Sequence, residues 1–213
     1  MFEEKSIRER LSAATPGSPV VIGVLSQDAV SVSILDRTRG FSDKFRELSE
    51  GVHSDAVEVT GHSLFTKPSA RKAAVNILVR IPASTEYVDV QVTAQNMLEK
   101  TPNLIGIFCS NEGTVTGLLA GTDDGKDLDR ENGIYKHITV IGFDAGITQK
   151  QAVRKRYIHG SITQDPYRIG YLAVELAYKA IKGESVAPLV DTGCKFYDYT
   201  NIDNQDIAQL VYD

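Results

Sequence analysis

Three segments in the middle of the chain, LIGIFCSNEG (104–113), ITVIGFDAG (138–146) and IHGSITQDP (158–166), decide the fold. In each one a short apolar run ends abruptly in polar residues, and a helical spacing of apolar residues follows. Strand, polar loop and helix in regular succession are typical of an open parallel α/β sheet. Such sheets bind ligands beyond the carboxyl ends of their strands. We therefore expect the function to lie at the edge of the sheet where these polar residues gather.

The same alternation extends toward both ends of the chain. Residues 20–25 form a near-continuous run of Val, Ile and Leu, which predicts a strand buried on both faces. The amphipathic spacing over 31–48 predicts the helix that follows this strand, ending before Gly51. The remaining predicted elements are helices at 6–14, 85–100 (N-capped by Ser84), 113–120, 148–155 and 167–182, and strands at 76–81, 104–109, 138–143 and 158–163.

The predicted helix at 167–182 has a strong amphipathic pattern, and Gly183 ends it. We expect one side of this helix to pack on the sheet. That side comprises Ile169, Leu172, Ala173, Leu176, Ala177 and Ala180.

Together these elements predict one doubly wound α/β domain, a single α/β lobe over residues 1–213. Its sheet has about five core parallel strands in flavodoxin-like order, with helices on both faces. Residues 52–75 fit the alternation least and predict an insertion, with a short strand at 56–60 and a short helix at 68–75 that starts with Pro68. Residues 190–213 form a polar tail with turn-forming residues.

Composition restricts the class of protein. Apolar residues make up 42% and charged residues 24% of the chain, which is ordinary for a soluble globular protein. The net charge of −5 argues against a nucleic-acid-binding surface, and no apolar run approaches the roughly 20 residues that span a bilayer. The first residues, MFEEK, lack the basic and apolar regions of a secretory signal. Either the protein is cytosolic, or a leader is missing from this sequence.

Common enzyme signatures are absent from the sequence. It contains neither a phosphate-binding loop of the Walker type nor a Gly-x-Gly-x-x-Gly motif after residues 20–25. It also lacks a Gly-x-Ser-x-Gly motif, and no His follows a predicted strand to act as a base beside Ser110. The four His and two Cys have no metal-ligand spacing, and the acidic loop at 121–135 does not match a calcium-binding loop. We predict a non-enzymatic protein without catalytic residues, metal or cofactor.

Four polar residues suit a ligand that is rich in hydroxyl groups. Arg supplies two parallel donors, Asp two acceptors, and Asn or Gln one donor and one acceptor group. Taken singly, each of them fits an ordinary loop or capping residue. Because all four lie at or just after the carboxyl end of a predicted strand, together they predict a binding site. The four residues are Arg37, Asn111, Asp144 and Gln164.

Several motifs carry a resemblance to a known family. They are DRTRGF (36–41), QNML (95–98) followed by PNL (102–104), FCSNEG (108–113), VIGFD (140–144) and SITQDP (161–166). With them the chain resembles the type I periplasmic sugar-binding proteins (ribose-binding-like), which share their fold with the regulatory cores of lactose-repressor-type transcription factors. In that family the residues at the matching positions hydrogen-bond the sugar. The resemblance thus implies ligand-binding roles for Arg37, Asn111, Asp144 and Gln164.

The resemblance extends from residue 20 to about residue 182 and covers only the C-terminal lobe of such a protein. It implies that residues 190–213 form a tail near the hinge and that half of the sugar site is missing, which predicts weak or undetectable sugar affinity. The strand and helix that follow the first helix in the family align with residues 76–98, which places the insertion before Asn76. A rival alignment puts that strand at 56–60 or 88–92, and the sequence leaves the choice open. By resemblance we expect an ABC-transporter permease as partner and a periplasmic or extracellular lipoprotein location.

Two other functions are compatible with the sequence. A regulatory sensor lobe of a lactose-repressor-type transcription factor would need a DNA-binding module, for which residues 1–16 are too short. An engineered or truncated scaffold domain would not bind a ligand tightly, and its exposed lobe face would drive self-association. None of these readings includes a nucleic-acid partner for this chain itself.

Overall fold

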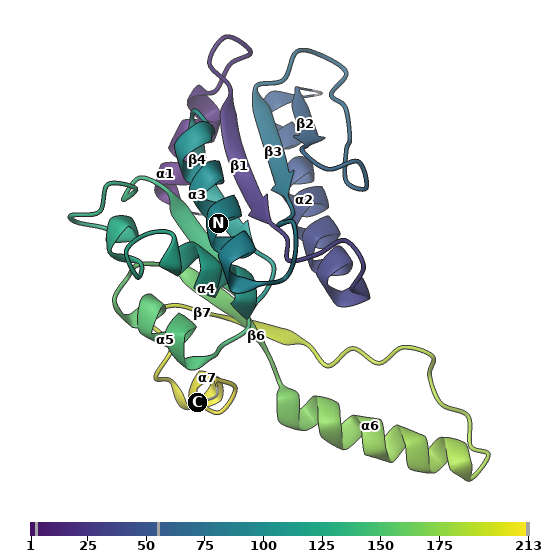
Figure 1. Cartoon of the computed structure of the whole chain (residues 1–213). Coiled ribbons are helices and arrows are strands. Elements are labelled where there is room, and N and C mark those ends of the chain that lie inside the picture. The colour runs from purple at the N-terminus through teal and green to yellow at the C-terminus, as the bar shows by residue number, and fades with distance from the viewer. Residues whose placement is uncertain (3, 55, 212–213) are drawn as a thin grey trace.

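The structure, a computed structural model, describes residues 1–2, 4–54 and 56–211 and is built around one seven-stranded sheet (Figure 1). Its order is β2-β3-β1-β4-β5-β6-β7, and every neighbouring pair is parallel except β6 with β7. The strands are β1 (Val20–Leu25), β2 (Val57–Thr60), β3 (Val75–Arg80), β4 (Leu104–Cys109), β5 (Thr139–Phe143), β6 (Gly160–Gln164) and β7 (Cys194–Tyr197). The predicted parallel α/β fold is confirmed.

The core of the sheet has the predicted flavodoxin-like order. Without β2 and β7 the order is β3-β1-β4-β5-β6, in which the first strand of the chain lies inside and later strands extend on one side. Both β1 and β4 are buried along their whole length, as expected for strands that are covered on both faces. The additional strand β2 lies within residues 52–75 and pairs with β3 at the edge.

The prediction of a short helix at 68–75 is wrong. Val59 and Lys67 exchange two backbone hydrogen bonds of 2.8 and 3.0 Å, so the chain after β2 turns back along that strand. Pro68 has no N–H group, and the following residues run irregularly until β3 begins at Val75. The backbone bridge between Val59 and Lys67 therefore ends directly before the residue at which the helix was predicted to start.

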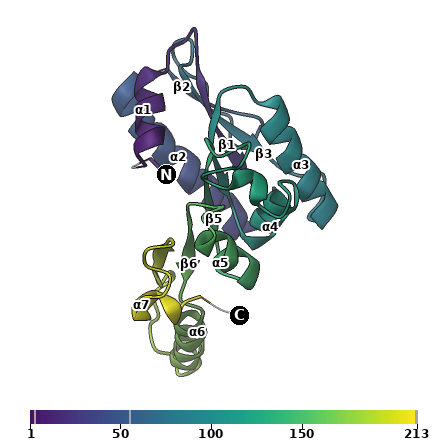
Figure 2. The same cartoon turned by 90° about the vertical axis from the view of Figure 1, so that its left-hand side faces the viewer.

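Helices cover both faces of the sheet (Figure 2). On one face α1 (Lys5–Ala13) and α2 (Val32–His53) pack through Ile7, Leu11 and Phe45. The other face is covered by α3 (Tyr87–Lys100), α4 (Glu112–Ala120) and α5 (Ile147–Arg154). Among the described residues, no helix has both the length and the apolar character needed to cross a membrane.

Two predicted helix boundaries differ from the structure. α2 continues through Gly51 to His53, because that glycine has no left-handed conformation and lies in open space. α3 begins at Tyr87 with Glu86 as its N-cap instead of Ser84. The Ser84 hydroxyl accepts a bond from the Glu86 N–H (3.1 Å), so it supports the turn before the helix. A short 3₁₀ helix, η1 (Lys126–Leu128), interrupts the acidic loop.

The last long helix, α6 (Pro166–Ile181), forms as predicted but does not pack on the sheet (Figure 1). None of its residues is buried, so the predicted buried side is wrong. The helix forms from local signals: Pro166 occupies its first turn, and the Asp165 carboxylate accepts a 2.8 Å bond from the Arg168 N–H. It stands away from the sheet because the chain leaves the body at the end of β6 and returns through exposed residues to β7.

The segment after β7 returns to the body of the protein. It includes α7 (Gln205–Ala208), and Ile202 and Ile207 are buried against the face covered by α3, α4 and α5. The β6–β7 pairing places Cys194 opposite Gln164. The tail therefore lies beside the edge of the sheet at which the ligand site is predicted.

Gly61→Ala tests the turn that follows β2. Gly61 has a φ of +100°, and a Cβ there would lie 2.1 Å from the Val79 carbonyl oxygen. We expect the substitution to lower the free energy of unfolding by about 1–3 kcal/mol. Urea unfolding monitored by circular dichroism measures the change.

The matched control for this prediction is Gly40→Ala. Gly40 lies within α2 with no atom within 4 Å of an added Cβ, so alanine should stabilise the helix by about 1 kcal/mol. Equal effects of the two substitutions would show that the turn at Gly61 does not need its left-handed backbone.

Candidate functional site

The guanidinium of Arg37 connects three strand ends at the carboxyl edge of the sheet. Its Nη1 atom donates a 3.1 Å hydrogen bond to the Ser110 carbonyl after β4, and Nη2 donates a 3.1 Å bond to Gln164 Oε1 at the end of β6. Both nitrogens lie 3.4 Å from the Asp144 carboxylate after β5. The structure thus brings together three predicted site residues: Arg37, Asp144, which is 107 positions further along the chain, and Gln164, which is 127 positions further.

An aromatic ring covers one face of the same guanidinium. The Cζ atom of Arg37 lies 3.8 Å from the centroid of the Phe143 ring, a cation–π contact worth on the order of 1 kcal/mol. With carbonyl, amide and carboxylate partners around its rim, the Arg37 side chain is only 17% exposed. Its position is therefore fixed before any ligand arrives.

Asp144 is held in an uncommon backbone conformation. Its φ is 79°, in the left-handed region that costs a non-glycine residue free energy. Three hydrogen bonds stabilise it: its N–H donates to Ile162 O (2.7 Å), and its carbonyl accepts bonds from Ser161 Oγ and Tyr197 Oη (2.9 Å each). The carboxylate accepts a 3.1 Å bond from the Glu112 N–H at the positive end of the α4 dipole. The acceptor oxygens are thus aimed by the backbone.

Asn111 has a structural role as well as its place at the site. It is the N-cap of α4, where its Oδ1 accepts a 3.1 Å bond from the Thr114 N–H and its own N–H donates to Thr114 Oγ1. It forms no hydrogen bond with Arg37, Asp144 or Gln164 in the described part of the chain. Asn111 therefore lies at the same edge but outside the cluster around the guanidinium.

Two side-chain amide groups at this edge have no hydrogen-bond acceptor among the residues that the structure describes. Across the described residues, neither Asn111 Nδ2 nor Gln164 Nε2 donates a hydrogen bond, because each amide uses only its oxygen. The Asp144 carboxylate still has lone pairs beyond those that accept from Arg37 and Glu112. The edge therefore offers one fixed cation, one fixed anion and two unused donors.

A second carboxylate, on Glu112, lies close to the first. Partial burial raises the pKa of Glu112, and the negative charge of Asp144 raises it further. Its carboxylate lies over Gly146, where an added Cβ would meet Glu112 Oε1 at 1.7 Å. A residue with a Cβ at 146 would therefore require the Glu112 side chain to move.

Sequence reasoning did not identify Phe143, Ser161 or Tyr197 as parts of the site. The only signal for Phe143 is its position directly before Asp144 at the end of a strand. Tyr197 lies 53 residues from Asp144 in the polar tail, and only the antiparallel pairing of β7 with β6 brings it close.

The described residues offer no metal-binding cluster, and their two cysteines form no disulfide. The described ranges contain no group of three or more His, Cys, Asp or Glu residues that can hold a metal ion. Cys109 and Cys194 are free thiols. Burial raises the pKa of Cys109 strongly, so this sulfur stays protonated and behaves as an apolar core atom.

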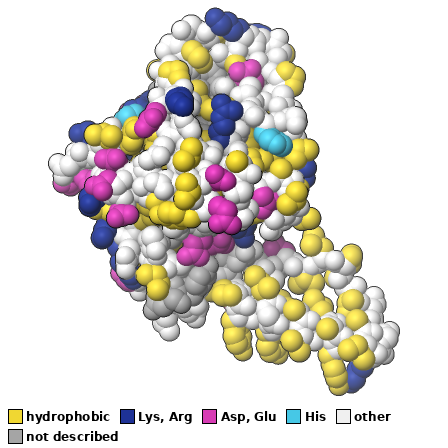
Figure 3. Space-filling view, in the orientation of Figure 1, with side chains coloured by type: hydrophobic (Ala, Val, Ile, Leu, Met, Phe, Trp, Pro, Cys, Tyr) yellow, Lys and Arg dark blue, Asp and Glu magenta, His cyan; other side chains and the backbone are white. Residues whose placement is uncertain are grey.

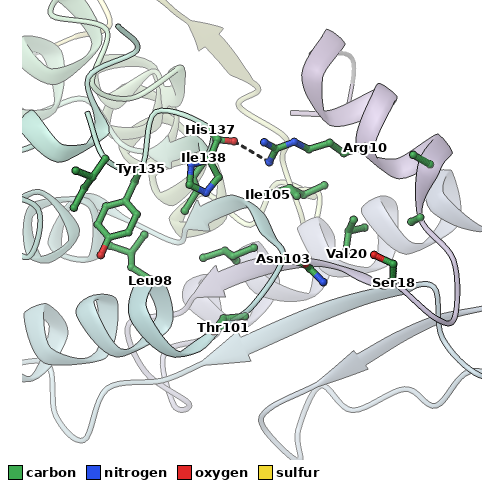
Figure 4. Close-up of a pocket in the computed structure, with 14 residues that line it drawn as sticks. Arg10, Ser18, Val20, Leu98, Thr101, Asn103, Ile105, Tyr135, His137 and Ile138 are labelled. Carbon is green, nitrogen blue, oxygen red and sulfur yellow. Dashed lines mark hydrogen bonds between the residues drawn. The ribbon is translucent and has the colours of Figure 1, made fainter. Parts of the chain in front are cut away.

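A separate cavity of about 540 Å³ lies between α1 and the amino ends of the strands, at the opposite edge of the sheet (Figure 4). Arg10 donates a 3.1 Å bond to the His137 carbonyl there, and Asn103 Nδ2 donates a 3.0 Å bond to Pro19 O. Burial and the charge of Arg10 both lower the pKa of His137. Since these polar groups already have partners, the carboxyl edge is the better candidate for a ligand site.

Comparison with known proteins assigns the family. The sequence profile described as "Periplasmic binding protein domain" matches residues 8–185, most of the chain. The chain belongs to this family. Ribose import binding protein RbsB of Salmonella typhimurium is 29% identical over 111 residues, which are 52% of this chain and 35% of that protein. The D-allose-binding periplasmic protein of Escherichia coli is 21% identical over 181 residues, 85% of this chain and 51% of its own length.

Solved structures of periplasmic binding proteins share the fold. "ABC transporter, LacI family transcriptional regulator" from Brachyspira murdochii is 34% identical, with a TM-score of 0.80 over 100% of this chain and 61% of its own. A solute-binding protein from Agrobacterium vitis with bound D-fucose is 19% identical, covers 97% of this chain and 60% of its own, and has a TM-score of 0.69, which shows the fold alone. The resemblance to type I periplasmic sugar-binding proteins is confirmed, and the chain spans about three-fifths of these two structures.

Glu112→Gln tests the proximity of the two carboxylates. Because the pKa of Glu112 is raised in the folded protein, the folded state binds a proton more readily than the unfolded state, and stability falls as pH rises through this range. Glutamine removes the repulsion, so the variant's Tm at pH 7 should be higher by about 1 °C, a small effect because the carboxylate is partly exposed. The difference should shrink as the pH falls and the Glu112 carboxyl becomes protonated.

Thermal unfolding at several pH values measures this effect. The control is Glu131→Gln, the same change at an exposed residue of the loop before β5, and it should not raise the Tm at pH 7. A Glu112→Gln variant that is less stable at pH 7 than at pH 4, relative to the wild type, would contradict the repulsion.

Proposed function

We propose that this chain is the carbohydrate-binding lobe of an ABC-transporter solute-binding protein, which binds a monosaccharide and catalyses no reaction. The observation that carries the proposal is the fixed guanidinium of Arg37, held between Asp144, Gln164 and the Phe143 ring. A site that is ordered before the ligand arrives loses less conformational entropy on binding. That arrangement favours recognition of a small rigid ligand.

The exposed groups match the hydrogen-bonding pattern of a sugar. Each hydroxyl both donates and accepts, so adjacent hydroxyls are recognised best where a carboxylate and an amide or guanidinium donor lie side by side. In the proposed complex, Asp144 accepts from the sugar while Asn111 Nδ2 and Gln164 Nε2 donate to it. Arg37 adds positive charge at the centre. The names of the relatives, which refer to ribose and D-allose, support this ligand class.

The proposal concerns one lobe of a larger binding site. The chain spans 61% of the Brachyspira structure, and its aligned part covers 35% of the ribose import binding protein. We infer that residues 1–213 form a single lobe with an insertion at 52–75 and a hinge-proximal tail at 190–213, of which 212–213 lie outside the described residues. By the same inference the whole protein is periplasmic or extracellular and delivers its sugar to a transporter permease.

A second candidate function is a regulatory sensor lobe. The 34% identical Brachyspira structure carries both "ABC transporter" and "LacI family transcriptional regulator" in its name. A sensor lobe would use the same four residues to bind its effector. It would differ in its partner, which would be a DNA-binding module in place of a permease.

Asp144→Asn tests the sugar site. We expect the wild-type chain to bind D-ribose or D-allose with a dissociation constant on the order of 1 mM or weaker, because half of the site is missing. Loss of the charged acceptor should weaken binding about 10- to 100-fold. Two-dimensional NMR titration up to about 50 mM sugar measures this, with shift changes expected at Arg37, Asn111, Asp144 and Gln164.

The matched control is Asp124→Asn, the same change at an exposed residue that also has a positive φ (52°). It should bind sugar like the wild type. Shift changes spread evenly over the surface, or none at the four residues, would refute the sugar site and favour a scaffold without a ligand. Micromolar binding by the monomer would refute the half-site.

A further inference from the structure

The cavity at the amino edge of the sheet has the size and the lining of a small-molecule site (Figure 4). Its volume of about 540 Å³ lies within the range of roughly 300–1,000 Å³ that such sites occupy. Most of its lining is apolar and comes from separate elements: Val20 of β1, Leu98 of α3, Ile105 of β4 and Ile138 directly before β5. The strand ends and α3 thus form an apolar surface that part of a ligand can cover.

The charge of this amino-edge cavity differs from that of the chain as a whole, which carries −5. Acidic side chains are spread over the surface of the protein, as the face in Figure 3 shows. None of the 14 described residues that line the cavity is Asp or Glu, whereas Arg10 and His137 both line it. Charge complementarity therefore favours an anionic ligand.

The guanidinium of Arg10 has unused donors in the cavity. Arg10 extends from α1 toward His137 (Figure 4), and its Nη1 atom donates the 3.1 Å bond to the His137 carbonyl. Within the described part of the chain, Arg10 forms no other hydrogen bond and no ion pair. A guanidinium has five N–H groups, and a carboxylate accepts from two of them at once. The backbone bond orients Arg10 and leaves most of its N–H groups for a ligand.

The imidazole of His137 lies close to the same guanidinium. Because burial and the charge of Arg10 lower the pKa of His137, the two side chains repel each other when both are charged. A carboxylate beside them would offset this repulsion. The ring of His137 has no hydrogen-bond partner among the described residues, so a neutral imidazole also keeps one N–H donor for a ligand.

The apolar lining restricts which anion fits. Sugar hydroxyls need donors and acceptors on several sides, and the side chains of Leu98, Ile105 and Ile138 offer none. Asn103 lines the cavity too, but its Nδ2 atom already donates to Pro19 O at 3.0 Å. An aliphatic or aromatic group, in contrast, gains from leaving water for such a surface. The lining therefore suits a ligand that is charged at one end and apolar at the other.

We propose that the amino-edge cavity binds a small carboxylate with an apolar part, whose charged group pairs with Arg10 and whose apolar part covers Leu98, Ile105 and Ile138. This site lies at the edge of the sheet opposite to Arg37, so it is separate from the proposed sugar site and does not depend on it. A carboxylate of about 12 non-hydrogen atoms should bind with a dissociation constant on the order of 1 mM.

Titration of the full isotope-labelled chain with phenylbutyrate, up to about 20 mM, tests the proposal by two-dimensional NMR. We expect saturable shift changes at Arg10, Leu98, Ile105 and His137, and none at Asp144. Phenylbutyramide has nearly the same shape without the charge, so it should bind at least about 10-fold more weakly. Acetate has the charge without the apolar part and should also bind at least about 10-fold more weakly.

Arg10→Gln tests the role of the guanidinium. Glutamine is a good helix former, so α1 is retained, and the loss of charge should weaken phenylbutyrate binding at least about 10-fold while leaving phenylbutyramide unchanged. The matched control is Arg8→Gln, the same change at an exposed residue of α1 outside the cavity, which should bind phenylbutyrate like the wild type.

A second variant, Ile134→Asp, places a negative charge on the lining at a residue that is 66% exposed, so the fold is insensitive to it. It should weaken binding of phenylbutyrate more than that of phenylbutyramide.

Three results would overturn the proposal. The first is a spectrum without shift changes at the cavity at 20 mM phenylbutyrate, or with changes spread evenly over the surface. The second is equal binding of phenylbutyrate and phenylbutyramide or acetate. The third is unchanged phenylbutyrate binding by both Arg10→Gln and Ile134→Asp. None of these outcomes changes the expected sugar titration.

Discussion

The contact between the Arg37 guanidinium and the Asp144 carboxylate is the constraint on which the candidate site depends. Both side chains are largely shielded from water, at 17 and 23% exposure, so each needs polar partners to offset lost hydration. The strand ends supply them: a carbonyl after β4, an amide at the end of β6 and a backbone N–H at the start of α4. Such a pair adds little net stability. Its partners hold the two side chains in one arrangement.

The position of Asp144 also depends on a residue in the tail of the chain, Tyr197. Asp144 has a positive φ, and a hydrogen bond from the Tyr197 hydroxyl helps to hold its carbonyl in place. Tyr197 is fully buried, and its strand pairs with β6 directly opposite Gln164 and its neighbours. The antiparallel strand β7 thus does more than complete the sheet. It connects α6, which leaves the body, to the backbone that aims the Asp144 carboxylate at the candidate site.

The sequence predicted what depends on local pattern. Continuous apolar runs identified β1 and β4, and the polar residues at strand ends placed Asp144 and Gln164 at one edge of the sheet. The predicted strand-end position is wrong for Arg37, which lies within α2 and reaches that edge through its long side chain. The sequence did not predict Tyr197, because a contact over 53 residues depends on strand register. Nor did it predict the irregular path after Pro68, where a bridge between Val59 and Lys67 decides the conformation. Such contacts leave no trace in local spacing.

The helix α6 is a second case in which sequence spacing does not predict a contact. Amphipathic spacing states how much of a helix must be covered, but it does not state by what, and the sheet is only one available surface. Gln164 ends β6 and α6 begins at Pro166, so a partner that covers α6 stands beside the amide that would donate to the ligand. Pro166 also restricts the backbone between them. If a partner on α6 changes how Gln164 is held, ligand binding must change the affinity for that partner by the same factor.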